Sequence, residues 1–467
     1  MKAFLIFLCL LIGALIVIAI PPMAAAHASD YGVTINTFYT GKATLLCTVF
    51  AVIAGWYAYR QEQHGQFLLQ MFIAALLIRL IVASLIFTNY GQEFFGGDAF
   101  TYDFLGQTQL QAWAGDNYSR LLVGNRMSGW GMSYFVGSVY AVIGRNMLAI
   151  QFLNAVMGAV TAVVIFIAAQ EVFTNIRVSK LAAVSIAFYP SLTLWSSQGL
   201  KDGPIVFLLA LAILATLRLG KEFTVKYLVV LVCALLCLLS LRFYVFYMMA
   251  TAVGGALVIG SRQFTAISFI RQFAILVVLA VALTYIGVPK FASEQYDTFG
   301  NLEKVERSRR DMARRGESGY GEDADVSTVD GAISNAPLGL LYLLFAPFPW
   351  QLTSIRQAIT LPEMLIWWAS FPMMILGLWF SIRYRLRVIA PILIFTTLLS
   401  LAYSVFQGNV GTAYRQRSQL LVFYFIFVAV GYVVVIEKRE EKKSREFDPA
   451  VISSVLSLSA TERRLQL

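Results

Sequence analysis

Residues 147–169 read MLAIQFLNAVMGAVTAVVIFIAA, an unbroken apolar stretch without a charged side chain. A helix of this length can cross the hydrocarbon core of a bilayer, which is about 30 Å thick. Comparable runs recur along the rest of the chain, and we expect each of them to form a membrane-spanning helix. The expected spans are residues 43–59, 67–88, 147–169, 181–199, 204–219, 227–241, 244–260, 268–288, 361–382, 388–406 and 419–437.

The composition of the whole chain agrees with these runs. Of the 467 residues, 59% are hydrophobic and only 13% are charged, whereas a soluble domain carries about 25% charged residues. The net charge of +10 fits basic loops that face anionic lipid, and no basic stripe points to nucleic acid. The sequence therefore predicts an all-α polytopic membrane protein with about 11–13 transmembrane helices. It excludes a soluble enzyme, a DNA-binding protein and a secreted disulfide scaffold.

The N-terminal residues 1–28 have the pattern of a secretory leader. Lys2 precedes an apolar stretch, and the small-residue signature Ala26-His27-Ala28 follows it. A cleaved signal peptide and an uncleaved signal anchor both fit this pattern. Both place residues 29–41 outside the cytoplasm.

The basic residues between the expected spans set the orientation. They concentrate in every second short connector, which the positive-inside rule places in the cytoplasm. These residues are Arg60, Arg177, Lys180, Arg218, Lys221, Lys226, Arg262, Arg383, Arg385 and Arg387. The sequence thus predicts a transmembrane domain over residues 29–437 and a charged cytoplasmic tail over residues 438–467.

Two large segments, residues 89–146 and 290–336, are predicted to lie outside the cytoplasm. The short apolar runs 130–144 and 337–350 are interrupted by Gly or Pro, so we expect interfacial or re-entrant helices there. The segment 290–336 is mixed in charge and poor in apolar residues, which predicts a solvated, mobile loop.

Polar residues that break the apolar pattern fall mostly on the predicted outer side, in short and glycine-rich segments. They are Asp98, Tyr102 and Asp103 after the second span, Lys201 and Asp202 in a very short turn, Arg242 in another, and Arg415 and Arg417 in the last outer turn. Charge kept at an outer membrane surface, against the positive-inside bias, suggests function. Each residue also has a structural interpretation. Asp98 could be a surface carboxylate, and Arg415 and Arg417 could be interfacial anchors. Lys201 could snorkel at a helix end, with Asp202 capping the helix that starts at Pro204.

Arg79 is the one clear charge expected at mid-membrane depth. A charge there costs a few kcal/mol or more, so either a carboxylate in the bundle pairs with it or it snorkels to the interface. The sequence leaves both possibilities open.

These residue types fit a reaction on a lipid-linked phosphate outside the cytoplasm. A carboxylate at the membrane surface can deprotonate an acceptor hydroxyl or amine. Arginine and lysine can hold a phosphate through charge-assisted contacts, and many apolar spans can hold a long lipid tail. The chain has no soluble nucleotide-binding unit, which argues against chemistry on nucleotide sugars.

Three short motifs resemble those of the GT-C class of integral membrane glycosyltransferases. They are Gly97-Asp98-Ala99 with Tyr102, the segment WSSQGLKD over residues 195–202, and GNVGTAYRQR over residues 408–417. The most similar branch contains the protein mannosyltransferases and the bacterial enzymes that glycosylate lipid A or lipopolysaccharide core. The resemblance covers roughly residues 40–437, and its individual motifs are short and degenerate.

The resemblance implies an inverting hexosyl- or pentosyltransferase of the bacterial inner membrane, with its active site on the extracytoplasmic face. Such enzymes move a sugar from a polyprenyl-phosphate carrier to a glycan, lipid or protein acceptor. The family pattern gives Asp98 the role of catalytic base, with Asp103 as a possible second carboxylate. Lys201, Arg415 and Arg417 would contact the carrier phosphate. Tyr102, Asp202 and Arg242 are further substrate-binding candidates.

The chain departs from the family at one position. Many members have a second acidic residue directly after the first, where this chain has Ala99. Asp103 could substitute, or one carboxylate could act without a metal, so dependence on Mg²⁺ or Mn²⁺ stays open.

Two other functions compete with this interpretation. A polysaccharide polymerase or ligase that joins lipid-linked glycans would use the same outer arginines. A flippase or transporter would need charged residues at mid-membrane depth in several spans, and Arg79 alone does not meet that requirement.

Overall fold

The computed structural model describes residues 35–61, 63–90, 97–124, 129–259, 277, 281, 301–315, 318–352 and 354–447. The predicted leader, residues 1–28, lies outside these ranges, as does most of the predicted span 268–288. Regular structure within the described residues is helical, apart from an isolated antiparallel bridge between Gly319 and Asn409.

The helical elements are α2 (Thr37–Tyr59), α3 (Gly65–Leu85), the π-helix η2 (Ile86–Tyr90), α5 (Asp98–Trp113), α6 (Asn117–Gly124), α7 (Trp130–Ile143), α8 (Met147–Phe173), α9 (Ile176–Phe188), α10 (Pro190–Ser196), α11 (Asp202–Lys221), α12 (Val225–Leu241), α13 (Phe243–Ile259), α16 (Leu302–Arg315), α17 (Val329–Phe345), the 3-10 helix η3 (Pro349–Gln351), α18 (Ile355–Ala358), α19 (Leu361–Phe406), α20 (Val410–Gln416) and α21 (Ser418–Phe447).

The described helices confirm the predicted all-α polytopic membrane class. Six of them are long and apolar enough to cross a bilayer, namely α2, α3 with the start of η2, α8, α11, α19 and α21. Helices α9 and α10 together make a further apolar pair, bent by 55°. Helices α12 and α13 are shorter apolar helices at the predicted spans 227–241 and 244–260.

Helix α8 lies at the centre of the first half of the bundle. It packs against α2, α3, α9 and α11, and nearly all of its residues are buried. A helix that is apolar on every side is stable only where other helices or lipid surround it. Here the surrounding elements are protein, so the stretch 147–169 forms the core on which the neighbouring spans pack.

Helix α19 joins two of the predicted spans, residues 361–382 and 388–406, in one bent element. The backbone leaves the helical conformation at Arg385, where φ is −136° and ψ is 17°. The predicted cytoplasmic connector is therefore a kink rather than a separate loop. Helix α21 packs along α19, and the two make up the second half of the bundle.

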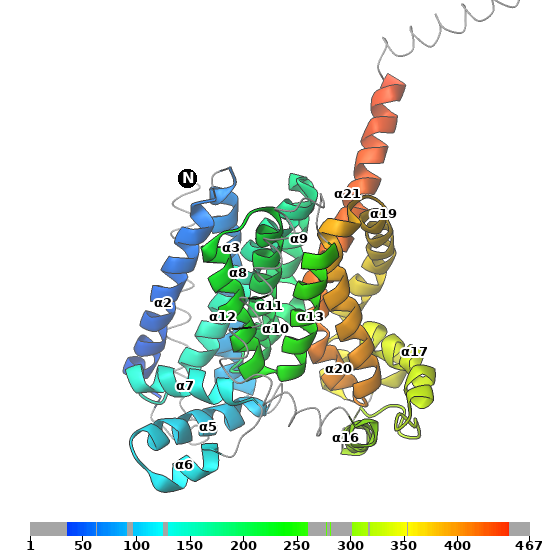
Figure 1. Ribbon diagram of the computed structural model, residues 1–467. Coiled ribbons are helices and arrows are strands. Elements are labelled where there is room, and N and C mark those ends of the chain that lie inside the picture. The colour runs from blue at the N-terminus through cyan, green and yellow to red at the C-terminus, as the bar shows by residue number, and fades with distance from the viewer. Residues whose placement is uncertain are drawn as a thin grey trace, which may run out of the picture.

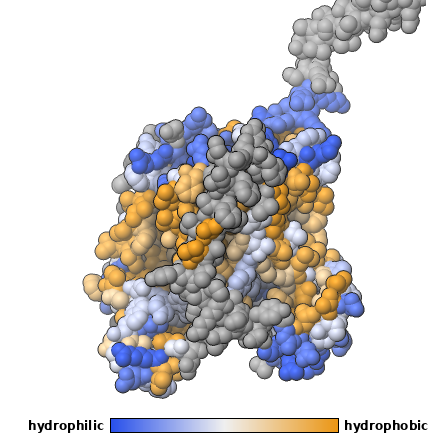
Figure 2. Space-filling model, viewed as in Figure 1, coloured by the Kyte–Doolittle hydropathy of each residue, from blue (hydrophilic) through white to orange (hydrophobic). Residues whose placement is uncertain are grey.

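The two ends of the bundle differ in the elements that they carry. Helices α5, α6, α16 and α20 lie at one end, and the C-terminal part of α21 projects from the other (Figure 1). Apolar residues form a band across the middle of the visible face, and hydrophilic residues lie at both ends of the bundle (Figure 2). Helix α7, at the apolar run 130–144, packs against α5 and lies across the end of the bundle (Figure 1).

The prediction of a mobile loop over residues 290–336 is wrong for its described part. Residues 302–315 form α16, and Arg309 is almost fully buried. Its guanidinium donates to the carbonyl oxygen of Gln407 at 3.2 Å and to that of Gly321 at 2.8 Å. Polar composition alone suggested a solvated loop, but these bonds fasten α16 to the segment that precedes α20.

Candidate active site

A cavity of about 810 Å³ opens where α5, α18 and α20 meet. This volume lies within the range of about 300–1,000 Å³ that is typical of small-molecule sites. Five of the predicted site residues line it: Asp98, Tyr102, Lys201, Arg242 and Arg415. They come from α5, the residue before α11, the turn between α12 and α13, and α20. These five residues, which the predicted topology placed on one side of the membrane, thus line one cavity.

Arg415 connects the two carboxylates of this site. Its Nε donates to Oδ2 of Asp202 at 2.6 Å, and its Nη1 donates to Oδ2 of Asp98 at 2.7 Å. Its guanidinium carbon lies 6.0 Å from the ring centre of Trp195. Burial disfavours the charge of Arg415, but the carboxylates of Asp202 and Asp98 outweigh it and raise its pKa. Arg415 is thus a permanently charged, oriented fork.

Asp202 is the fixed carboxylate of the pair. It is the first residue of α11 and is fully buried. Besides Arg415, it faces Arg242, whose Nη2 lies 3.4 Å from Oδ1. A buried carboxylate needs such charged partners, so Asp202 serves to hold both arginines in place.

Asp98 is the accessible carboxylate. It begins α5, directly after Gly97, and its side chain is 55% exposed, against 0% for Asp202. An acceptor molecule that enters the cavity can therefore reach Asp98 but not Asp202. The two carboxylates have different environments and, on this ground, different roles.

Tyr102 and Lys201 lie together beside Asp98. Tyr102 is four residues after Asp98, which puts both on one face of α5. The Nζ of Lys201 is 5.9 Å from the ring centre of Tyr102. Burial, and then the carboxylate of Asp98, raise the pKa of Tyr102 to about 12, so its hydroxyl is a neutral donor at neutral pH.

Lys201 gives the site a predicted pH dependence. Burial and the neighbouring Arg242 lower its pKa to about 8, so Lys201 is largely charged at pH 7 and loses its charge as the pH rises through about 8. Binding of a phosphodiester anion in this cavity is expected to weaken above pH 8 in the wild type. Lys201→Arg should retain its affinity to at least pH 9, because arginine stays charged. Titrating the dissociation constant from pH 6.5 to 9.5 tests this, and coincident profiles would show that another group titrates.

The structure does not bring Asp103 to the cavity. Asp103 accepts from the hydroxyl of Tyr140 at 2.5 Å and forms a bidentate ion pair with Arg145, and it is 6% exposed. Five residues along a helix turn the side chain by about 140°, so Asp98 and Asp103 point in different directions. The interpretation of Asp103 as a second catalytic carboxylate has no geometric support.

Arg417 is also absent from the cavity lining, although it was predicted to contact the carrier phosphate. It is fully buried and donates to the carbonyl oxygens of Leu344 at 2.9 Å and Ala346 at 3.0 Å. Two residues turn a helix by about 200°, which directs Arg415 and Arg417 to opposite sides. Arg417 fastens α20 to the end of α17.

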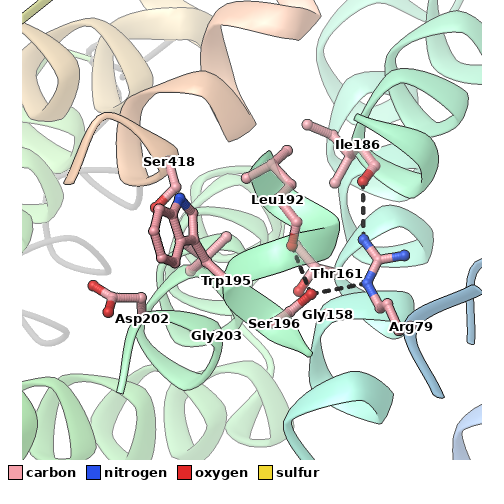
Figure 3. Close-up of a pocket in the computed structure, with 11 residues that line it drawn as sticks. Arg79, Gly158, Thr161, Ile186, Leu192, Trp195, Ser196, Asp202, Gly203 and Ser418 are labelled. Atoms are coloured by element: carbon pink, nitrogen blue, oxygen red, sulfur yellow. Dashed lines mark hydrogen bonds between the residues drawn. The ribbon is translucent and has the colours of Figure 1, made fainter. Parts of the chain in front are cut away.

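Arg79 supports the bend that leads to Lys201 and Asp202. Pro190 has no N–H, so the carbonyl of Ile186, four residues earlier, loses its helical donor. Arg79 replaces it with bonds to the carbonyl oxygens of Ile186 at 3.3 Å and Ala187 at 2.6 Å, and its Nε donates to Oγ of Ser196 at 2.9 Å (Figure 3). The guanidinium therefore joins the two arms of the bend between α9 and α10. The sequence left open whether Arg79 pairs with a carboxylate or snorkels to the interface. Its hydrogen-bond partners are instead backbone carbonyls and the hydroxyl of Ser196.

The turn after α10 has its own anchor in the core. The Nδ2 of Asn154, on the central helix α8, donates to the carbonyl oxygens of Gln198 and Leu200 at 2.7 Å each. Leu200, one of the two acceptors, directly precedes Lys201 in the sequence. The apolar core thus fixes the backbone that presents Lys201 and Asp202.

Sequence reasoning missed three residues near the site. Tyr414 and Arg356 line the cavity, and Glu363, buried in α19, accepts from the hydroxyl of Tyr414 at 2.8 Å. A carboxylate at the start of an apolar run could have drawn attention to Glu363. The segment that contains α18 has no periodic pattern, so nothing in the sequence indicated Arg356.

The described residues around the cavity do not form a grouping of ligands suited to a divalent cation. No group of three or more His, Cys, Asp or Glu side chains with the spacing of metal ligands occurs in the described ranges. The carboxylates of Asp98 and Asp202 are directed at Arg415, and three cations surround them. Mg²⁺ and Mn²⁺ need several oxygen ligands, which this arrangement does not offer.

An all-helical membrane bundle with the accessible carboxylate of Asp98 and four cations around an end cavity fits a membrane transferase that acts on an anionic lipid. Residues 129–287 match the model of the dolichyl-phosphate-mannose-protein mannosyltransferase family. The match covers 159 of the 467 residues. It confirms the predicted resemblance to the GT-C class and supports a membrane glycosyltransferase that uses a lipid-linked sugar. It includes Lys201, Asp202 and Arg242, whereas Asp98 and Arg415 lie outside it. No curated protein matches the chain.

Proposed function

We propose that this protein transfers a sugar from a polyprenyl-phosphate carrier to an acceptor with inversion at the anomeric carbon. The observation that carries the proposal is the meeting of the accessible Asp98 with Lys201, Arg242 and Arg415 in one cavity. The acceptor is a glycan, a lipid or a protein, and the donor is a hexose or pentose linked to the carrier phosphate. The chemistry needs one base and a set of cations, and the cavity supplies both.

Each group has one task in this reaction. Asp98 takes the proton of the acceptor hydroxyl as its oxygen attacks the anomeric carbon. The bond between that carbon and the phosphate oxygen breaks, and its electron pair leaves with the polyprenyl phosphate. Lys201, Arg242 and Arg415 stabilise the negative charge that collects on the phosphate. A single displacement from the face opposite the phosphate inverts the anomeric centre.

A donor-consumption assay tests this function. The protein is reconstituted in liposomes with a panel of polyprenyl-phosphoryl hexoses and pentoses and with envelope glycan, lipid and protein fractions as acceptors. Release of polyprenyl phosphate with at least one donor is the expected result. Arg177 forms an exposed ion pair with Glu440 away from the cavity. Arg177→Gln is therefore the control variant and should release polyprenyl phosphate as the wild type does. Use of nucleotide sugars in place of every lipid-linked donor would contradict the proposal.

We infer that the cavity lies on the extracytoplasmic face of a bacterial inner membrane, with α21 ending in the cytoplasm. The distribution of basic connectors supports this orientation. Cysteines at Tyr118, which is 70% exposed, and at the exposed Glu441 give a direct test. A membrane-impermeant maleimide should label Tyr118→Cys in spheroplasts and Glu441→Cys only after lysis. Labelling of both positions from one side would overturn the orientation.

A further inference from the structure

The two contacts of Arg415 differ in strength. The contact with Asp202 is buried, since the side chain of Asp202 is fully shielded and that of Arg415 is 16% exposed. The contact with Asp98 joins Arg415 to a carboxylate that is 55% exposed. Buried ion pairs are costly to break, whereas exposed pairs contribute little. An incoming anion would therefore displace Asp98 and leave Asp202 in place.

The contact with Asp98 also engages one oxygen of the proposed base. Oδ2 of Asp98 accepts from Nη1 of Arg415 at 2.7 Å, so this oxygen is occupied. A general base must come within hydrogen-bond distance of the proton that it removes. One of the two oxygens of Asp98 is thus engaged by a cation that the donor phosphate also needs.

The cavity has an excess of positive charge that suits an anion. Four cations line it, Lys201, Arg242, Arg356 and Arg415, beside the carboxylate of Asp98 and the buried carboxylate of Asp202. A sugar joined to a polyprenyl chain through a phosphodiester has one negative charge, which this excess attracts. Phosphate oxygens can accept two parallel bonds from a guanidinium, whereas Asp98 accepts one. The phosphate would also meet Lys201, which lies beside Tyr102 on the face of α5 that carries Asp98.

We propose that the donor phosphate exchanges with Asp98 on Arg415 and so releases the base. Asp202 retains Arg415 throughout, while Asp98 turns from the arginine towards the acceptor. Donor binding then precedes productive acceptor binding, and the enzyme without a donor keeps its base engaged. This proposal rests on the proposed function and adds an order of binding to it.

Donor affinity is the measurement that tests the exchange. Asp98→Asn removes the charge that competes with the phosphate for Arg415. The variant should bind a polyprenyl phosphodiester about two- to fivefold more tightly than the wild type, which corresponds to the loss of one exposed ion pair. Binding is measured by calorimetry in lipid nanodiscs without an acceptor. Asp98→Glu, which keeps the competing charge, should not tighten binding, and Asp330→Asn at an exposed position should leave it unchanged.

The outcomes separate this proposal from the function on which it rests. Lost transfer together with tighter binding supports the exchange. Lost transfer with equal or weaker binding by a folded Asp98→Asn protein overturns the exchange and leaves the base role intact. Transfer at the wild-type rate would refute the base role itself. Asp98→Ser also removes the competing charge, and it is measured in place of Asp98→Asn where the latter does not fold.

Discussion

Asp98→Asn is expected to lower the rate of sugar transfer by about 10²–10⁴-fold, the usual effect of removing a general base. Asparagine keeps the shape of the side chain but cannot take a proton at neutral pH. Asp98 begins α5 and is 55% exposed, so the substitution removes little packing. The amount of folded protein in the membrane should stay at the wild-type level. Turnover of a polyprenyl-phosphoryl sugar by the purified variant measures the effect.

Asp103→Asn is the internal control on the same helix. Asp103 is buried and bonds to Tyr140 and to Arg145, whose side chain is 33% exposed, so loss of its charge removes a partly buried ion pair and lowers stability. This variant should therefore reduce the thermal stability and the yield of the protein, with near-normal turnover by the fraction that folds. A comparable loss of turnover in stable Asp103→Asn protein would point instead to a carboxylate pair. Wild-type turnover by Asp98→Asn would return Asp98 to a surface role.

Several membrane spans, such as residues 147–169, could be predicted because a bilayer imposes one strong constraint. A spanning segment must form its backbone hydrogen bonds internally and carry apolar side chains over about 30 Å of hydrocarbon. The apolar run at residues 147–169 meets this requirement. The same argument placed Asp98, Lys201, Arg242 and Arg415 at one end of the bundle. These four line one cavity. Topology therefore supplied the neighbourhood of the site from the sequence alone.

The rotation of each helix could not be predicted in the same way. Asp98 and Asp103 share α5, and Arg415 and Arg417 are two residues apart, yet one member of each pair is buried away from the cavity. Which side of a helix faces the cavity depends on packing against neighbours such as α7 and α17. A short segment gives no periodic signal to reveal this. The partners of Arg79 could not be predicted either. They include backbone carbonyls, which every residue has and which the sequence therefore does not distinguish.

Arg415 carries the second large expected effect. It bonds to both the accessible Asp98 and the buried Asp202, and the proposed function adds the donor phosphate to its partners. Lysine keeps the charge but has no planar fork, so it cannot bond to Asp202 and a phosphate in the same geometry. Arg415→Lys should raise the donor KM by about 10–100-fold, since each charged hydrogen bond contributes about 1.5–3 kcal/mol. The kcat should fall as well, because the leaving phosphate loses a stabilising contact.

Arg417→Lys separates a phosphate contact from a structural one. Arg417 is fully buried and bonds to the carbonyl oxygens of Leu344 and Ala346, so its replacement should lower stability and leave the donor KM of the folded protein unchanged. Donor KM and thermal unfolding of both variants, measured side by side, decide the matter. A normal donor KM in Arg415→Lys would exclude Arg415 as the phosphate ligand, and a raised donor KM in stable Arg417→Lys protein would transfer that role to Arg417. Arg415 lies in α20 and Arg417 caps its C-terminus, and the two side chains face different directions. A difference in donor KM between the two variants therefore reports the position of the phosphate rather than the loss of an arginine from this segment.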